Sequence, residues 1–480
     1  MNARRMAAGA AAALALVALG GYGFFWRPAE RRAAWTASVA PPPALGDFPT
    51  ELNARVQSLT TRAQSQPGDI AALGELGRLY DANGFAHEAA QAYAGLLRFD
   101  PRNALWPHLL AHLLAGNGRL AEAVPLWRRA SELAPDYVPA RLRLGEALLK
   151  TNDPAAAAAV YAAALQHAPD DPYALLGLAR CELQLDHWTT AREHLQQAAR
   201  AHPDFGVAWN LLATVYERLG NGTGAAAAQA RAEGTRRFRE LADPWVDALL
   251  ADCYDVYRLR VAASAATNSG DPRDALPWIE RAGQLAPKDP AVLRQWGDTF
   301  AELRDFARAR EYFQRACELA PADDANYLQW ISACEAAGDS AGAARALAAG
   351  LYRCPESAGL QFAAGRRLAS AGHAEEALAA FNAVRRLQPE TAAAYLEIAT
   401  IHFRAGRDAL GVAALEDALA HAPDHVPTLL ALAQHALESN DAAAAAQWLD
   451  RARTHAPAGQ ADAVETLARD FQRRFGRRPW

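Results

Sequence analysis

The feature that most constrains the fold of this 480-residue chain is a proline that recurs every 34 residues. The prolines at this spacing fall into two series, separated by one longer interval. They are Pro67, Pro101, Pro135, Pro169 and Pro203, then Pro287, Pro321, Pro355, Pro389, Pro423 and Pro457. Because proline cannot continue a helix, it marks the same helix end in every unit. The length alone would suggest about three globular domains, but this period predicts stacked repeats instead.

Two further series share the spacing and place a turn and a helix crossing inside each unit. With the exception of Arg304, the first holds residues that tolerate a left-handed backbone, as a tight turn between helices requires. It runs through Gly84, Gly118, Asn152, Asp186, Gly220, Gly270, Arg304, Gly338, Gly372, Gly406 and Asn440. The second holds small residues where two helices cross closely: Ala89, Ala123, Ala157, Ala191, Ala225, Ala275, Ala309, Ala343, Ala377, Gly411 and Ala445. We therefore predict an all-α chain of helix-turn-helix units.

The residues between these positions resemble the tetratricopeptide repeat (TPR), whose pattern is W-x2-L-G-x2-Y, then A-x3-F, then P. The first unit matches at Leu73 (in the Trp place), Leu76, Gly77, Tyr80, Ala89, Tyr93 and Pro101. The fifth unit matches at Trp209, Leu212, Tyr216 and Ala225. The resemblance spans residues 70–459 and implies a TPR solenoid of about eleven units in two arrays. It also implies that the first helix of each pair lines a groove that holds a peptide or protein.

The N-terminus carries no charge from Met6 to Trp26, a run long enough at about 1.5 Å per residue to cross a bilayer core of roughly 30 Å. We interpret residues 1–26 as a single N-terminal transmembrane helix, with a cleaved signal peptide as the alternative. Aromatic residues at the end of the run favour the anchor. Residues 27–46, with three consecutive prolines, are expected to form a stiff, extended spacer. Arg4 and Arg5 favour a periplasmic or extracytoplasmic body.

The repeat spacing is interrupted once, between Pro203 and Pro287, where two periods are lengthened by 16 residues. The second helix of the fifth unit is expected to continue to about Leu241, after which Asp243-Pro244 restarts a helix. We predict a leading helix, a first TPR array, a helical insert, a second array, and a capping helix with a basic tail, over 47–66, 70–224, 225–255, 256–459 and 460–480. The insert forms either a packed joint, which we favour, or a dedicated partner site.

Partner binding is expected on the groove-facing positions of the first helices and, in the alternative, on the insert. The groove candidates are Arg78, His108, His112, Glu146, Arg180, Asn210, Thr214, Arg294, Asp298, Arg366 and Phe403. The insert candidates are Arg236, Trp245 and Tyr257. This mixture of Arg, acids, amides and apolar residues suits an extended peptide. With only two lysines in the chain, the Lys/Asn/Arg carboxylate clamp of some TPR proteins cannot be assembled in its usual form.

Motifs for catalysis, cofactors and metals are weak or absent. His108 and His112 have the spacing of two metal ligands, but no third ligand can be assigned, so we predict no metal site. The five cysteines contain no C-x2-C pair, and no nucleotide-binding motif points to a small-molecule substrate. Ser340 lies in a G-x-S-x-G sequence, but at the turn position of the repeat, where no nucleophile elbow is expected. The net charge of -5 offers no broad basic surface for nucleic acid.

These patterns predict a membrane-anchored TPR scaffold or adaptor that binds proteins or peptides in its groove and is not an enzyme. The first alternative is an accessory subunit of an envelope export or assembly machine, docked through residues 225–255. A metal-dependent enzyme that uses His108 and His112 is the least favoured alternative.

Overall fold

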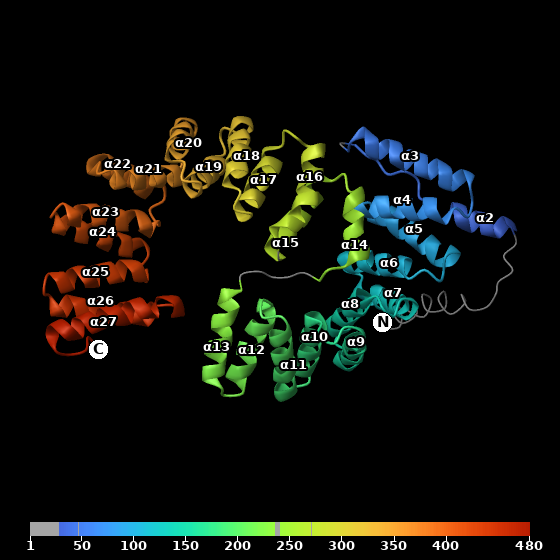
Figure 1. The fold of residues 1–480 in the computed structure, drawn as a ribbon, viewed down its shortest axis with the longest axis horizontal. Coiled ribbons are helices and arrows are strands. Elements are labelled where there is room, and N and C mark those ends of the chain that lie inside the picture. Colours follow the sequence, from blue (N-terminus) through green and yellow to red (C-terminus); the bar gives the residue numbers. More distant parts are fainter. Residues whose placement is uncertain (1–27, 47, 236–240, 270) are drawn as a thin grey trace, which may run out of the picture. The chain divides into compact units, whose positions relative to one another are not determined.

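The computed structural model describes residues 28–46, 48–235, 241–269 and 271–480, and within these ranges the chain forms helices and no strand (Figure 1). None of these helices is both long enough and apolar enough to span a bilayer. The predicted anchor, residues 1–26, lies outside the described residues. The chain divides into two compact units, residues 1–287 and 288–480, which we treat separately.

The first unit contains five consecutive helix pairs with the predicted repeat spacing. The first helices of the pairs are α4 (Ile70–Ala82), α6 (Leu105–Gly116), α8 (Val138–Lys150), α10 (Pro172–Gln184) and α12 (Gly206–Arg218). The second helices are α5 (Ala86–Phe99), α7 (Leu120–Leu133), α9 (Pro154–His167), α11 (Trp188–Ala201) and α13 (Gly222–Gly234). A single helix, α3 (Thr50–Ser65), packs against α4 ahead of the first pair.

The second unit also contains five pairs and ends in one more helix. The first helices are α17 (Pro290–Glu302), α19 (Asp324–Ala336), α21 (Ala358–Ser370), α23 (Ala392–Arg404) and α25 (Val426–Glu438). The second helices are α18 (Phe306–Leu319), α20 (Ser340–Arg353), α22 (Ala374–Leu387), α24 (Asp408–His421) and α26 (Ala442–His455). Helix α27 (Ala461–Phe475) packs against α25 and α26 and buries Val464, Ala468 and Phe471. The predicted all-α TPR solenoid is confirmed for the described residues.

The turn positions adopt the left-handed backbone that the sequence series predicts. Positive φ angles occur at Gly84, Gly118, Asn152, Asp186, Gly220, Arg304, Gly338, Gly372, Gly406 and Asn440. Gly270 of the same series lies outside the described residues. Arg304 has a φ of 62° although arginine disfavours this region, so the geometry of the turn prevails over the preference of the residue.

In several pairs a glycine of one helix packs closely against an aromatic ring of the other. A Cβ atom added to Gly297 of α17 would lie 2.4 Å from Cε1 of Phe313 in α18. Tyr161 of α9 fits in the same way against both Gly145 of its own pair and Gly177 of the next. The small residues of the second sequence series are likewise buried, as predicted. The core of each unit therefore lies between the helices of its successive pairs.

The N-terminal segment differs from the extended spacer predicted for residues 27–46. Helix α2 (Pro28–Thr36) places Trp35 in the core, where its indole N–H donates a 2.7 Å hydrogen bond to the carbonyl of Ala63 in α3. The Trp35 ring also meets Phe99 of α5 edge to face, at 5.0 Å between centroids. The prediction of a spacer was wrong here because apolar side chains bury this segment against α3 and α5.

The interruption of the repeats also differs in detail. Helix α13 ends at Gly234 and does not continue to Leu241 as expected; a short helix, α14 (Pro244–Asp247), and a 3-10 helix, η2 (Ala248–Asp252), follow. The next pair consists of α15 (Val256–Ser269), the 3-10 helix η3 (Pro272–Ala275) and α16 (Leu276–Leu285). We expected this pair to begin the second array, but it belongs to the first compact unit.

Candidate functional site

The predicted groove residues of the first unit lie on one face of its first helices, α4, α6, α8, α10 and α12, and we call the part of this face over α4, α6 and α8 the first groove. Side chains four residues apart lie on one face of a helix, which places His108 and His112 of α6 together. A stretch far along the chain, Asp243–Tyr254, lies against this face, and we call it the return segment. Its α14 contacts α6 and its η2 contacts α4 (Figure 1).

The return segment places the carboxylate of Asp243 in the groove, where its side chain is 1% exposed. His108, which is fully buried, lies with Nε2 at 2.9 Å and 3.1 Å from the two carboxylate oxygens. The Tyr137 hydroxyl, at the start of α8, donates a 2.6 Å hydrogen bond to the same carboxylate. Because a carboxylate only accepts hydrogen bonds, His108 donates through Nε2. Three elements thus converge on one carboxylate.

Trp245 completes this contact with its ring and its backbone. The indole stacks on the Tyr137 ring at 3.6 Å between centroids and 10° between planes. Its backbone N–H donates a 3.0 Å hydrogen bond to the Tyr137 hydroxyl, which therefore both donates and accepts. The edge of the indole also meets His108, at 5.4 Å. Stacked and edge-to-face rings of this kind add about 0.5–1.5 kcal/mol beyond their buried area.

The charges around Asp243 keep it ionised. Burial by itself raises the pKa of this carboxyl, but the hydrogen bonds from His108 and Tyr137, together with the Arg143 guanidinium 3.8 Å away, hold the pKa below its usual value. The pKa of the neighbouring His112 is also lowered, to about 4, by burial and by the positive charge of Arg143. Because histidine is a base, this lower pKa favours its uncharged form. At neutral pH the cluster therefore holds one carboxylate, one guanidinium and an uncharged His112.

A second contact, on α4, holds the backbone of the return segment. The Asn83 amide donates a 3.0 Å hydrogen bond to the carbonyl of Asp252 and accepts one of 2.6 Å from the N–H of Tyr254. The Asn83 side chain therefore binds the main chain on both sides of Cys253. Contacts of this type hold an extended chain without reading its side chains.

Further contacts surround the end of the return segment. Arg55 of α3 forms a 2.8 Å ion pair with Asp252, and the Tyr254 hydroxyl lies 3.2 Å from the carboxylate of Glu51. The Arg281 guanidinium of α16 lies over the Tyr254 ring, 4.6 Å from its centroid. These contacts join α3, α4 and α16 through a single tyrosine, a geometry that fits the packed joint favoured from the sequence.

The predicted insert residues have different environments. Trp245 is half-buried against Tyr137, as described above, whereas the side chain of Tyr257 is 71% exposed. Arg236 lies outside the described residues. The structure thus separates Trp245, which has an intramolecular role, from Tyr257, which is accessible to a partner.

The other candidates of the first unit are more accessible than His108. Arg180, Asn210 and Thr214 are exposed on α10 and α12. Glu146 pairs with Lys150 at 2.8 Å on its own helix. Arg78 is half-buried, and its Nε has no hydrogen-bond partner among the described residues. The far end of this face, over α10 and α12, is therefore not reached by the contacts of Asp243 and Asn83.

In the second unit, the corresponding face of α19, α21, α23 and α25 is what we call the second groove. The fifth position of each of these helices carries a half-buried apolar side chain. The four are Leu328, Phe362, Leu396 and Leu430. Equivalent positions in successive repeats lie side by side in a solenoid, so these side chains form a row.

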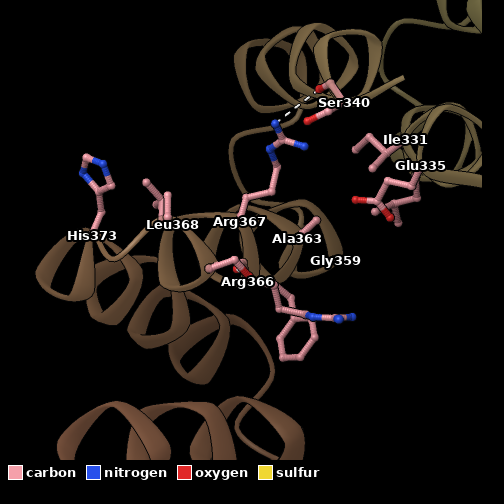
Figure 2. Close-up of a pocket in the computed structure, with 13 residues that line it drawn as sticks. Ile331, Glu335, Ser340, Gly359, Ala363, Arg366, Arg367, Leu368 and His373 are labelled. Carbon is pink, nitrogen blue, oxygen red and sulfur yellow. Dashed lines mark hydrogen bonds between the residues drawn. The ribbon is translucent and has the colours of Figure 1, made fainter. Parts of the chain in front are cut away.

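A cleft of about 730 Å³ opens between α19 and α21 and includes Leu328 and Phe362 in its lining (Figure 2). Figure 2 shows two arginines leaving α21 in different directions. Arg367 donates a 3.3 Å hydrogen bond to the carbonyl of Ser340. Arg366 is exposed and forms no ion pair within the described part of the chain. The cleft therefore combines an apolar wall with an accessible cation.

The remaining predicted residues of the second unit lie on α17 and α23. On α17, Arg294 pairs with Asp323 at 2.8 Å, and burial raises the pKa of Asp298 to about 6. On α23, Phe403 stacks on His435 of α25 at 4.6 Å. Phe403 and Arg294 therefore contact neighbouring repeats, and Arg366 is the candidate that stays accessible in the middle.

The side chains that could bind a metal ion or act as a nucleophile lie in surroundings that do not favour this chemistry. Among the described residues, no three His, Cys, Asp or Glu side chains lie close enough to hold a metal ion. Burial raises the pKa of the Cys181 thiol to about 12 and that of Cys253 to about 11, which disfavours the reactive thiolate. Ser340 is the first residue of α20 and follows no strand.

The sequence analysis did not identify several residues that build the contact in the first groove: Asn83, Tyr137, Arg143 and Asp243. Asn83 and Tyr137 flank first helices, outside the helical positions that the repeat pattern marks. The Asp243-Pro244 pair was interpreted only as a helix start. The one available signal was the pair of aromatic candidates at the interruption of the repeats, Trp245 and Tyr257.

Comparison with known proteins supports the repeats. Sequence models of the tetratricopeptide repeat match residues 148–215, 108–172 with 362–419, and 290–323, so the chain carries TPR units. A curated relative, protein FlbA of Caulobacter vibrioides, is 31% identical over 168 residues, which are 33% of this chain and 28% of FlbA. The chain thus matches less than a third of that relative.

Solved structures with similar architecture include yeast Tom70, at 14% identity and a TM-score of 0.39, covering 84% of this chain and 96% of Tom70. Another is MamA of Desulfovibrio magneticus RS-1, at 19% identity and a TM-score of 0.30, covering 40% of this chain and 97% of that one.

Proposed function

We propose that the chain is a scaffold whose second groove binds an extended segment of a partner protein. The observation that carries this proposal is the row formed by Leu328, Phe362, Leu396 and Leu430. Four successive first helices each present an apolar side chain at the same position, half-buried and still in contact with solvent. A partner segment that covers this row removes apolar surface from water at about 25 cal/mol per Å².

The residues beside the row would allow the backbone of a partner segment to approach the second groove closely. The second position of each helix carries a residue with a short side chain or with none. These residues are Ala325, Gly359, Ala393 and Pro427. At Gly359 an added Cβ would lie 2.8 Å from Cδ1 of Leu328. This position thus leaves room for Leu328 in the cleft. The exposed Arg366 in the middle favours a partner with a carboxylate among its apolar residues.

A peptide library displayed on phage tests the proposal on the full chain. We expect the protein to enrich apolar peptides with an acidic residue, and the double substitution Phe362→Ser with Leu396→Ser to abolish that enrichment. Leu410→Ser is the matched control, because Leu410 is 52% exposed but lies on a second helix, α24, away from the row. Identical enrichment by the double variant and the control would refute binding at this row.

We further propose that residues 1–26 anchor this scaffold in a membrane with its body on the periplasmic or extracytoplasmic side. The support is the uncharged run from Met6 to Trp26 and the arginines that precede it. A reporter fused after Trp480, active in one compartment only, tests the orientation; cytoplasmic activity would overturn it. Docking of an envelope machine through the insert has less support, because Trp245 is engaged within its own chain.

A further inference from the structure

The return segment is held in the first groove by the kinds of contact that hold a bound peptide. Its Asp243 carboxylate is bound by His108 and Tyr137, its Trp245 ring stacks on Tyr137, and its backbone at Asp252 and Tyr254 is bound by Asn83. A buried charge, a stacked ring and a backbone clamp are three independent anchors. Together they identify the segment as an occupant of the groove.

The receptor side of this contact belongs to the repeats and not to the insert. His108 lies within α6, Tyr137 precedes α8, and Asn83 follows α4. Their separations from the residues that they bind are 135, 106 and 169–171 positions along the chain. The helices that carry them follow the ordinary repeat spacing of the array. The binding groups are therefore carried by the repeats themselves.

The receptor also has a defined chemistry. Arg143 and the Nε2 and hydroxyl donors of His108 and Tyr137 face one point, so that point suits a carboxylate. The Tyr137 ring beside it suits an aromatic side chain two residues further along. Removing the carboxylate would leave buried donors unpaired, at a cost of about 1–3 kcal/mol for each group. An unoccupied first groove would thus favour any segment that restores these contacts.

We propose that the first groove is a binding site for a segment that starts a short helix, with a carboxylate at the helix start two residues before an aromatic ring, and that the chain's own return segment fills it. A partner segment with this chemistry binds there only by displacing Asp243 and Trp245. This goes beyond the function proposed for the second groove and concerns different residues. The two can fail separately, because the second-groove test uses substitutions on α21 and α23 only.

The test uses a fluorescent synthetic peptide with the sequence of residues 241–256, in which Cys253 is replaced by serine. The full chain is compared with a variant that carries Asp243→Ala and Trp245→Ala, which removes both side-chain anchors in cis. A tethered segment competes at an effective concentration of the order of millimolar. We therefore expect the peptide to bind this variant at least tenfold more tightly than the wild-type chain.

Two controls make the test specific. Tyr257→Ala removes an exposed aromatic residue just beyond the return segment and should leave peptide binding as weak as in the wild type. A second peptide with the Asp243→Ala and Trp245→Ala changes should not bind the double variant. If the double variant loses its helical circular dichroism, the isosteric Asp243→Asn chain serves instead, with at least a threefold gain expected.

The outcomes separate clearly. Tighter binding of the unmodified peptide to the double variant, or to the Asp243→Asn chain, supports the proposal. Equally weak binding to the wild type and to whichever of these variants is folded overturns it. The same gain with the Tyr257→Ala chain also overturns it, because the groove would then be opened by any change near the insert. The gain should disappear when His108→Ala is added to the folded variant.

Discussion

Lowering the pH from 7 to 5 should weaken the first groove through His112. Its pKa is lowered to about 4 by burial and by Arg143, while His108 adds a smaller effect in the same direction and Asp243 one in the opposite direction. In the unfolded chain the same side chain titrates near 6.5. Between these values the unfolded state binds more protons than the folded state. The contribution is therefore complete above about pH 6.5 and decreases as the pH falls towards 4.

The size of the effect follows from the two pKa values. The difference between 6.5 and about 4, at 1.36 kcal/mol per unit, gives an upper limit of about 3.4 kcal/mol for the whole window. Roughly half of this, or about 1.8 kcal/mol, falls between pH 7 and pH 5. Because the His112 side chain keeps some contact with solvent, screening reduces the effect. We expect about 1 kcal/mol, which corresponds to a roughly fivefold change in local opening.

Hydrogen exchange of the α6 amides is the suitable assay, because a long repeat array does not unfold in a single two-state transition. After correction for the intrinsic pH dependence of exchange, the wild type should lose about fivefold more protection between pH 7 and pH 5 than the His112→Gln variant. His87→Gln, an exposed histidine on α5, is the control and should behave as the wild type. The same loss of protection in wild type and His112→Gln would refute the reasoning.

Three further predictions concern the packing. Gly177→Ala should reduce the hydrogen-exchange protection of the α10 amides by an amount equivalent to about 1–3 kcal/mol, because its Cβ would lie 2.3 Å from Cζ of Tyr161. Its control, Gly222→Ala, has open space around the added Cβ and should not lower the protection of the α13 amides. Arg304→Gly should raise the protection of the α17 and α18 amides by about 1 kcal/mol by relieving the left-handed turn, and unchanged or lower protection would contradict that strain. Trp35→Ala should expose residues 28–46 to limited proteolysis; cleavage no faster than in the wild type would show that burial of the ring does not hold this segment.

The sequence period was sufficient to predict the repeats. It also predicted a left-handed turn at one residue, Arg304, that disfavours this backbone conformation. The 34-residue series required a left-handed turn at Arg304, where the side chain alone would argue against it, and the structure has that turn. A signal repeated in many units outweighs the preference of one residue because neighbouring units impose the same geometry. Local contacts between adjacent helices therefore follow from the sequence pattern.

Contacts that skip many units do not follow from it. His108 was predicted as a polar groove residue and considered as a metal ligand, whereas its partner Asp243 lies 135 residues further along. No repeat spacing relates these two positions, since Asp243 lies in the interruption. Trp35 was missed for a related reason: the prolines after it suggested an extended spacer, although the ring needs a buried surface, which α3 and α5 supply.

The return segment also changes how the first unit should come apart. A solenoid that has only neighbour contacts loses its terminal repeats one at a time. Here Arg55 of the leading helix, Asn83 of the first pair and Tyr137 of the third are all fastened to one short stretch that follows the fifth. Fraying of the N-terminal end therefore requires these distant contacts to break together. Under a pulling force the first unit should unfold in one large step. An array without these contacts would unfold in a series of small steps, one repeat at a time.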